Sequence, residues 1–138
     1  MTVPPKMAIE TSRELFTTLL AYGANKPRLV EMAAIDLAEL ETSDGRYPVA
    51  KHLDLWKAGE NLLQLAAIGL QMGSNSDPYN RGIVGLVFTA SANLEEAVAN
   101  KLRYTKILAD HISLEFEKSQ DTFSITYSIL DGYFHSYE

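Results

Sequence analysis

Apolar positions recur at helical spacing through the first half of the chain. Thr11 and Glu14 form a capping box, in which Thr caps the first turn and Glu reaches back, and they predict a helix start at residue 11. The apolar side chains that follow share one helical face: Leu15, Phe16, Leu19 and Leu20. We expect Gly23 to end this helix and Pro27 to open a segment of one or two short helical turns.

A second helical stripe follows Pro48, after a loop at 41–48 with Asp44-Gly45 as its turn. The stripe consists of Val49, Leu53, Trp56, Leu63, Ala67 and Leu70. Most polar side chains of this region fall outside it, so we predict one helix over 48–70 with a single buried face. Gly59 is the weak position in that helix, costing about 1 kcal/mol relative to Ala if exposed. The alternative for Gly59 is close packing against a neighbouring element.

The segment 82–91, "GIVGLVFTAS", fits a buried strand or a short buried helix, and periodicity does not separate the two. Asn93 and Glu96 then form a second capping box. The helix that they start has an inward face predicted to contain Leu94, Ala97, Val98, Leu102, Thr105 and Leu108.

The hydrophobic period changes from 3.6 to 2 after residue 111, which predicts a hairpin over 111–130. Its apolar face is expected to contain Ile112, Leu114, Phe116, Phe123, Ile125, Tyr127 and Ile129. A two-stranded ribbon alone is marginal in water, so it should pack on the helices. The fold class is therefore α+β, with a helix-rich N-terminal half packed on a small antiparallel sheet that includes this hairpin. An unpaired edge of that sheet is expected to make the chain self-associate.

Length and composition indicate one ordinary globular domain. The chain has 138 residues, of which 46% are hydrophobic and 22% are charged. We expect a disordered leader at 1–8 and a single domain at 9–138. Cysteine is absent, which excludes disulfides and thiolate metal sites. The apolar run "IVGLVF" is too short for a membrane helix, and the N-terminus lacks a signal-peptide core, so we expect a cytoplasmic protein without membrane contact.

The charge balance argues against nucleic-acid binding by this chain alone. It carries 12 basic and 18 acidic residues, a formal net charge of -6, and its pI is near 5.0. A nucleic-acid-binding domain usually shows a basic stripe and a pI above about 9.

Catalytic and cofactor signatures are missing from the sequence. His52, His111 and His135 do not have the spacing of metal ligands, and no serine lies in a nucleophile elbow. Glu95 and Glu96 lie in the first turn of a predicted helix, where the helix dipole favours carboxylates. We therefore expect no cofactor, no metal and no enzymatic activity.

The order of parts from residue 82 to 117 resembles the N-terminal effector domain of one branch of the AraC/XylS family of bacterial transcription regulators, the so-called arabinose-binding domain. The matching positions are Gly82, Gly85, Ser91, Leu94, Glu96, Ala97, Arg103 and Tyr104. The family usually has threonine where this chain has Asn93, and both residues can cap a helix. The resemblance extends over residues 9 to 130, including the proline-started helix and the hairpin.

This resemblance implies a ligand-sensing and dimerisation domain that controls a C-terminal helix-turn-helix domain. That DNA-binding part is missing here, so we expect a chain truncated at its C-terminal end. The implied partners are an unknown small-molecule effector, a second copy, and DNA only through the missing domain. The candidate effector-binding residues are Trp56, Arg103, Tyr104, Phe116 and Tyr127, whereas Gly82, Gly85, Asn93 and Glu96 are structural.

Two alternatives remain beside this interpretation. A ligand-free structural or protein-interaction module would have a closed, well-packed core between the helices and the hairpin. A small enzyme is disfavoured by the missing catalytic residues. Arg103 also has two roles open to it: an anchor for an anionic effector, which suits a guanidinium, or a charge pair with Glu96 or Asp110.

Overall fold

The computed structural model describes residues 3–42, 45–65 and 67–133, and the side chains of residues 80 and 81 are not described. The elements in chain order are β1 (Lys6–Ala8), α1 (Ile9–Ala21), α2 (Lys26–Met32), α3 (Leu37–Leu40), β2 (Arg46–Pro48), α4 (Val49–Leu63), α5 (Ile68–Ser74), the 3₁₀ helix η1 (Pro78–Arg81), α6 (Gly82–Thr89), α7 (Leu94–Leu108), β3 (Ile112–Lys118) and β4 (Phe123–Ile129). The two antiparallel sheets, β1–β2 and β3–β4, confirm the α+β class.

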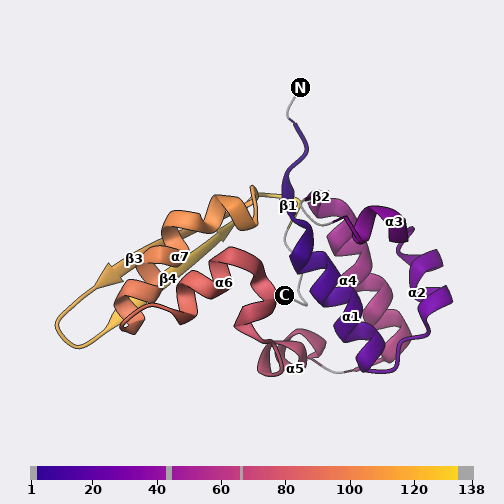
Figure 1. The fold of residues 1–138 in the computed structure, drawn as a ribbon, viewed down its shortest axis with the longest axis horizontal. Coiled ribbons are helices and arrows are strands. Elements are labelled where there is room, and N and C mark those ends of the chain that lie inside the picture. The colour runs from indigo at the N-terminus through magenta and orange to yellow at the C-terminus, as the bar shows by residue number, and fades with distance from the viewer. Residues whose placement is uncertain (1–2, 43–44, 66, 134–138) are drawn as a thin grey trace.

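The elements form two groups (Figure 1). The helical group contains α1–α4 and holds the main core, and the hairpin group contains α6, α7, β3 and β4. The short strands β1 and β2 join the groups at one end, where Met7 bridges Ala109. Arg46 fixes the same junction, because it pairs with the Asp110 carboxylate at 2.5 Å and donates to the Lys6 carbonyl at 2.9 Å.

The expected leader is shorter than predicted, because Lys6–Ala8 is strand β1. Residues 1 and 2 lie outside the described residues. The expected loop at 41–48 likewise contains β2, whose Tyr47 pairs with Met7, while Asp44 of the expected turn is not described. Both strands are three residues long, which is too short for a period-2 pattern to reveal.

Helix α1 begins at Ile9, two residues before the predicted start, and Thr11 does not cap it. The start is set by tertiary contacts: the Ile9 N–H donates to the Gly45 carbonyl at 3.1 Å, and the Ile9 side chain is buried. Glu14 instead accepts a hydrogen bond from the Ser76 hydroxyl at 2.9 Å. The predicted end is confirmed, because Gly23 follows the helix at φ +101°, where glycine is favoured.

The predicted helix over 48–70 is two helices. Helix α4 starts after Pro48 as expected but ends at Leu63, and Gln64 then has a left-handed backbone at φ 52°. Ala67 is left-handed too, so α5 starts in a new direction. This turn buries Ile68, whereas Leu70 of the predicted stripe is 79% exposed. No glycine or proline lies between Leu63 and Ile68, so no local sequence signal marks the break.

Gly59 of α4 packs directly against Leu19 of α1. A Cβ atom added at Gly59 would lie 2.4 Å from Leu19 Cδ2 and 2.8 Å from Leu19 Cδ1. Leu19 is fully buried in the core of the helical group. The close-packing interpretation of Gly59 is therefore confirmed.

Residues Gly82–Thr89 form helix α6. The segment 82–91, which fitted either a buried strand or a short helix, is therefore mainly helical. The capping prediction at α7 is confirmed: the Asn93 side chain accepts from the Glu96 N–H, and the Glu96 carboxylate accepts from the Ala92 N–H, both at 2.9 Å. The inward face of α7 is confirmed for Ala97, Val98 and Thr105, which are buried, with Leu102 and Leu108 half-buried. Leu94 was placed wrongly, since it is 54% exposed.

The hairpin has the predicted register. Its apolar side chains pair across the strands, with Ile112 opposite Ile129, Leu114 opposite Tyr127 and Phe116 opposite Ile125. The alternating side chains of β3 are half-buried on this face and exposed on the other. Helix α7 packs against β3, so the helices cover the β3 part of the apolar face more than the β4 part.

Tyr47 is a buried side chain with an unsatisfied hydroxyl. The residue is 1% exposed, and Tyr47 Oη has no hydrogen-bond partner among the described residues. Burial raises the pKa of Tyr47 above its ordinary value. The folded chain therefore holds this proton more tightly than the unfolded chain, and the associated stability is lost as the pH rises above about 10.

We expect Tyr47→Phe to raise the free energy of unfolding by about 0.5–2 kcal/mol, because it removes a buried polar atom that lacks a partner. The fall in stability above about pH 10 should also become smaller. Tyr22→Phe is the control, because Tyr22 Oη donates to the Gln71 carbonyl and accepts from Asn75. Urea denaturation at pH 7 and pH 10.5 measures both effects, and equal losses in the two variants would contradict this account.

Candidate functional site

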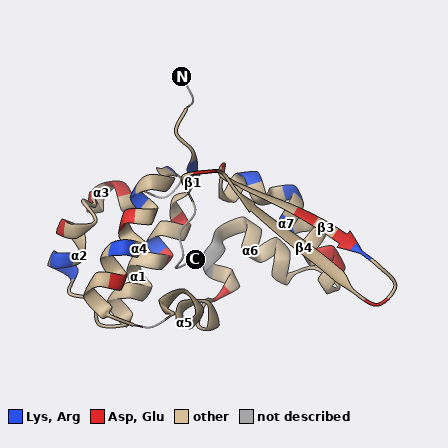
Figure 2. Ribbon diagram, turned by 180° about the vertical axis from the view of Figure 1, so that it is seen from behind, with Lys and Arg blue, Asp and Glu red and all other residues tan. Residues whose placement is uncertain are grey.

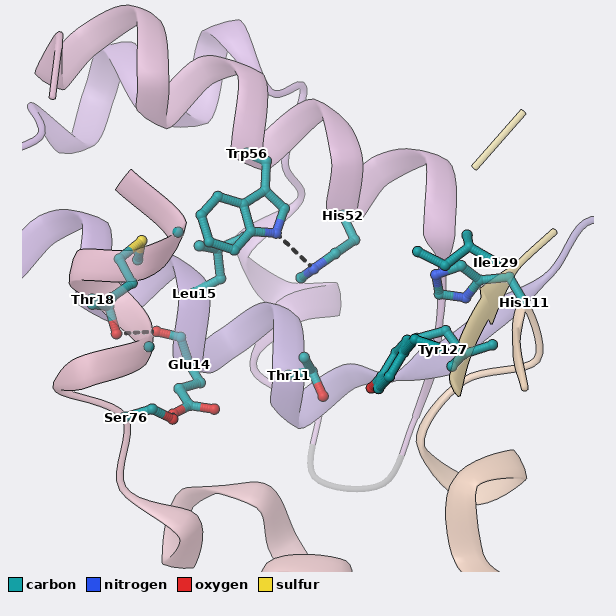
Figure 3. A pocket seen from close by; sticks show the side chains of 14 residues that line it. Thr11, Glu14, Leu15, Thr18, His52, Trp56, Ser76, His111, Tyr127 and Ile129 are labelled. Carbon is teal, nitrogen blue, oxygen red and sulfur yellow. Dashed lines mark hydrogen bonds between the residues drawn. The ribbon is translucent and has the colours of Figure 1, made fainter. Parts of the chain in front are cut away.

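A cleft of about 490 Å³ lies between the helical group and the hairpin (Figure 3). Helices α1, α4 and α5 form one side of it, and the start of β3 and the end of β4 form the other. The lining residues are Thr11, Glu14, Leu15, Thr18, His52, Trp56, Gly69, Met72, Gly73, Ser76, His111, Ile112, Tyr127 and Ile129. A volume of this size lies within the range of small-molecule sites.

Trp56 and His52 form the α4 wall of the cleft, four residues apart and therefore on one helical face. The Trp56 indole N–H donates to His52 Nε2 at 3.1 Å, and His52 Nδ1 lies 2.9 Å from the Ser12 hydroxyl. Because an indole N–H can only donate, Nε2 is the accepting nitrogen, and Nδ1 carries the proton of the neutral ring. This chain of contacts fixes the orientation of the indole ring in the cleft.

Helix α1 supplies three polar side chains to the cleft. Thr11, Glu14 and Thr18 follow one another at helical spacing and lie toward the cleft (Figure 3). Glu14 accepts from the Ser76 hydroxyl, which brings the segment after α5 to the same wall. Glu14 is the only Asp, Glu, Lys or Arg side chain among the described lining residues.

The hairpin wall carries His111, Ile112, Tyr127 and Ile129. His111 is 3% exposed, and its ring lies 6.3 Å from that of Tyr133. Figure 3 shows the Tyr127 side chain pointing toward Thr11 across the cleft. The two groups thus present hydroxyls to the same space, beside the apolar surface of Leu15, Met72 and Ile129.

The structure brings together only two of the five candidate effector-binding residues. Trp56 and Tyr127 line the cleft on opposite walls. Phe116 lies away from the cleft, with its ring 5.7 Å from that of Phe123. Tyr104 and Arg103 lie on α7 outside the lining, with Tyr104 half-buried and Arg103 exposed.

The two suggested charge partners of Arg103 are engaged elsewhere. Asp110 pairs with Arg46, and Glu96 accepts from the Ala92 N–H at the start of α7. Arg103 therefore makes neither of the suggested charge pairs among the described residues. Four polar residues that line the cleft were not among the sequence-based candidates. Thr11 and Glu14 were interpreted as a helix cap, and His52 and His111 were set aside because they lack the spacing of metal ligands.

The two glycines that were predicted to be structural, Gly82 and Gly85, have different roles. Gly82 follows η1 at φ +61°, and a Cβ added there would meet no atom within 4 Å, so backbone conformation rather than close packing favours glycine. Gly85 is buried and lines a second cavity of about 330 Å³ between α6 and α7. The other described lining residues of that cavity are Ser76, Pro78, Val84, Phe88, Lys101 and Leu108.

The described part of the chain shows neither a metal-binding cluster nor a membrane-spanning helix. It contains no cluster of three His, Asp or Glu side chains placed to share a metal ion, although His135 lies outside the described residues. None of its helices combines the length and the apolar character needed to cross a bilayer.

Comparison with known proteins identifies the family. Residues 23–137 match the family described as the arabinose-binding domain of AraC transcription regulators, at their N-terminal end. The chain belongs to this family. The family consists of transcription regulator domains, which is a regulatory rather than an enzymatic class.

A relative of this AraC-type domain is the ornithine utilization regulator of Pseudomonas aeruginosa. The two are 27% identical over 101 residues, which cover 73% of this chain and 30% of that protein. The chain therefore spans less than a third of the length of this curated relative.

Proposed function

We propose that this chain is the effector-sensing domain of an AraC-type regulator, and that the cleft between the two groups holds the effector. The observation that carries this proposal is the composition of the cleft walls: one wall comes from α1 and α4, and the opposite wall comes from the hairpin. A ligand in such a position contacts both groups at once. It would stabilise the arrangement of the two groups that fits it best, and so shift the population of that arrangement.

In the full-length protein this shift would be transmitted to a C-terminal helix-turn-helix domain, and the regulator would act as a homodimer. The acidic net charge of this chain supports the proposal that the helix-turn-helix domain, and not this domain, contacts DNA. The alternative interpretation, a ligand-free structural or protein-interaction module, predicts a closed core between the helices and the hairpin. A cleft of about 490 Å³ at that place favours the sensing function over that alternative.

The lining favours a small amphipathic effector with a basic group. Leu15, Trp56 and Met72 offer apolar contact, while Glu14 offers a negative charge, and no Lys or Arg is among the described lining side chains. Ornithine carries ammonium groups that complement Glu14, and the name of the relative makes it a suitable first probe beside arabinose, a neutral sugar.

Glu14→Gln tests this effector class. We expect it to weaken binding of a basic effector about tenfold or more, because it removes the charge that faces the ligand's ammonium group and keeps the side chain's shape. Glu117→Gln is the matched control, since Glu117 is exposed on β3 away from the cleft. Isothermal titration calorimetry with ornithine and arabinose measures the effect. Equal affinities for the wild type and both variants would contradict the proposed role of Glu14.

A further inference from the structure

The two groups meet at a junction, which consists of β1, β2 and the turn at 109–111 between α7 and β3 (Figure 1). Figure 2 shows basic and acidic positions beside β1, where the groups come together. Strand β1 holds the turn through its backbone. The Asp110 N–H donates to the Lys6 carbonyl at 2.9 Å, and the Lys6 N–H donates to the Asp110 carboxylate at 3.0 Å.

The Arg46 side chain ties three parts of this junction together. From β2, its guanidinium donates to the Asp110 carboxylate at 2.5 Å and to the Lys6 carbonyl at 2.9 Å. It also donates to the carbonyl of Ile107, in the last turn of α7, where carbonyls have no partner within the helix. A planar guanidinium presents its donors in a fixed arrangement, so these contacts define one geometry. Because the pair with Asp110 is partly exposed, it adds little to folding stability, and its main effect is on orientation.

The walls of the cleft start at this junction. Helix α1, with Thr11, begins directly after β1, and α4, with His52, begins directly after β2. On the hairpin side, the lining residues His111 and Ile112 directly follow Asp110. A small rotation at the junction therefore changes the spacing of the walls along the cleft. The 3₁₀ helix η1 also links the groups, since it packs against α1 and α6, so a weakened junction loosens the arrangement without separating the groups.

We propose that Arg46 is a positioning residue for the effector cleft. Acting through Asp110, it sets the angle between the helical group and the hairpin, and hence the fraction of molecules whose cleft walls are spaced for a ligand. Arg46 is not among the lining residues, so its loss removes no contact with a ligand. The apparent affinity of a ligand falls in proportion to the fraction of molecules in the competent arrangement. For its ligand this inference rests on the proposed function, whereas the angle can be measured without one.

Distances between two spin labels test the angle, because the chain has no cysteine of its own. Lys57→Cys on α4 and Glu117→Cys on β3 place one label on each group, at exposed positions outside the cleft lining. Double electron–electron resonance then gives the distribution of distances between the groups. Without ligand, we expect Arg46→Gln to widen this distribution about twofold, because more than one angle becomes populated.

Arg13→Gln is the matched control. The Arg13 guanidinium also donates to two carbonyls, those of Leu40 and Thr42, but both lie at the end of α3 and not across the junction. Its loss should leave the distance distribution unchanged. Asp110→Asn is a second test variant in case Arg46→Gln does not fold. It keeps one oxygen that can accept from Arg46 and removes the charge, so we expect a smaller widening.

Calorimetry with ornithine and arabinose completes the test. For the compound that binds the wild type, we expect Arg46→Gln to weaken binding about fivefold, and a saturating amount of that compound to restore the wild-type distance distribution. Distributions for Arg46→Gln and Asp110→Asn as narrow as that of Arg13→Gln would overturn the role of Arg46. A widened distribution with unchanged affinity would overturn its effect on the cleft. If the wild type binds neither compound, the proposed function loses support, and the distances without ligand still decide whether Arg46 sets the angle.

Discussion

Leu19→Ala is expected to lower the free energy of unfolding by about 2–5 kcal/mol, the largest effect that we predict for a single substitution. Leu19 is fully buried in the core of the helical group, where it lies over Gly59 of α4. Truncation of the Leu19 side chain leaves a cavity between α1 and α4. Urea or guanidinium denaturation measures the loss.

The contact between Leu19 and Gly59 also predicts a coupling. Gly59→Ala alone should be destabilising by about 1–3 kcal/mol, since the new Cβ overlaps the Leu19 side chain and the core must shift. In the Leu19→Ala background the overlapping atoms are gone, so the same substitution should become neutral or stabilising by up to about 1 kcal/mol through helix propensity.

Gly73→Ala in α5 is the control for helix propensity, because a Cβ added there meets no atom within 4 Å. It should be stabilising by about 0.5–1 kcal/mol in either background. Additive effects of Leu19→Ala and Gly59→Ala would show that the two residues are not in contact.

His52→Ala is expected to cost about 2–4 kcal/mol and to weaken effector binding. The substitution removes a buried ring and leaves the Trp56 N–H and the Ser12 hydroxyl without the hydrogen bonds that His52 provides. Because the indole then loses its fixed orientation, the cleft wall is less well organised for a ligand.

Trp56→Phe separates the two parts of this effect. It keeps an aromatic ring and removes the N–H, so only one partner of His52 is lost, and we expect a cost of about 1–2 kcal/mol. The two variants are compared by chemical denaturation and by calorimetric titration with ornithine. A loss in His52→Ala no larger than that in Trp56→Phe would show that the contact with Ser12 contributes nothing measurable.

Local patterns predicted those elements whose causes are local. The Asn93 cap, the Gly23 helix end and the register of the hairpin depend on residues close in sequence, and all three are confirmed. The start of α1 was wrong because a hydrogen bond from Ile9 to Gly45 sets it, across 36 residues of chain. The break at Gln64 was missed because packing of Ile68 into the core, rather than a glycine or proline, determines it.

The site was harder to predict than the fold for the same reason. Aromatic character selected Trp56 and Tyr127, which line the cleft, and also Tyr104 and Phe116, which lie outside its lining. Thr11 and Glu14 matched a capping pattern, but α1 begins at Ile9, so both residues lie within the helix and do not cap it. Only the arrangement of α1 against the hairpin shows that the Thr11 side chain faces Tyr127 (Figure 3).

The most direct test of the effector cleft uses the single tryptophan of the chain, which is Trp56. Its emission is recorded while candidate effectors, with ornithine and arabinose first, are titrated into the protein, and binding is measured in parallel by calorimetry. The account predicts that a compound that binds changes the Trp56 emission with the same dissociation constant, and that Glu14→Gln shifts both curves together. A compound that binds tightly while leaving the Trp56 emission unchanged would show that the effector site lies elsewhere.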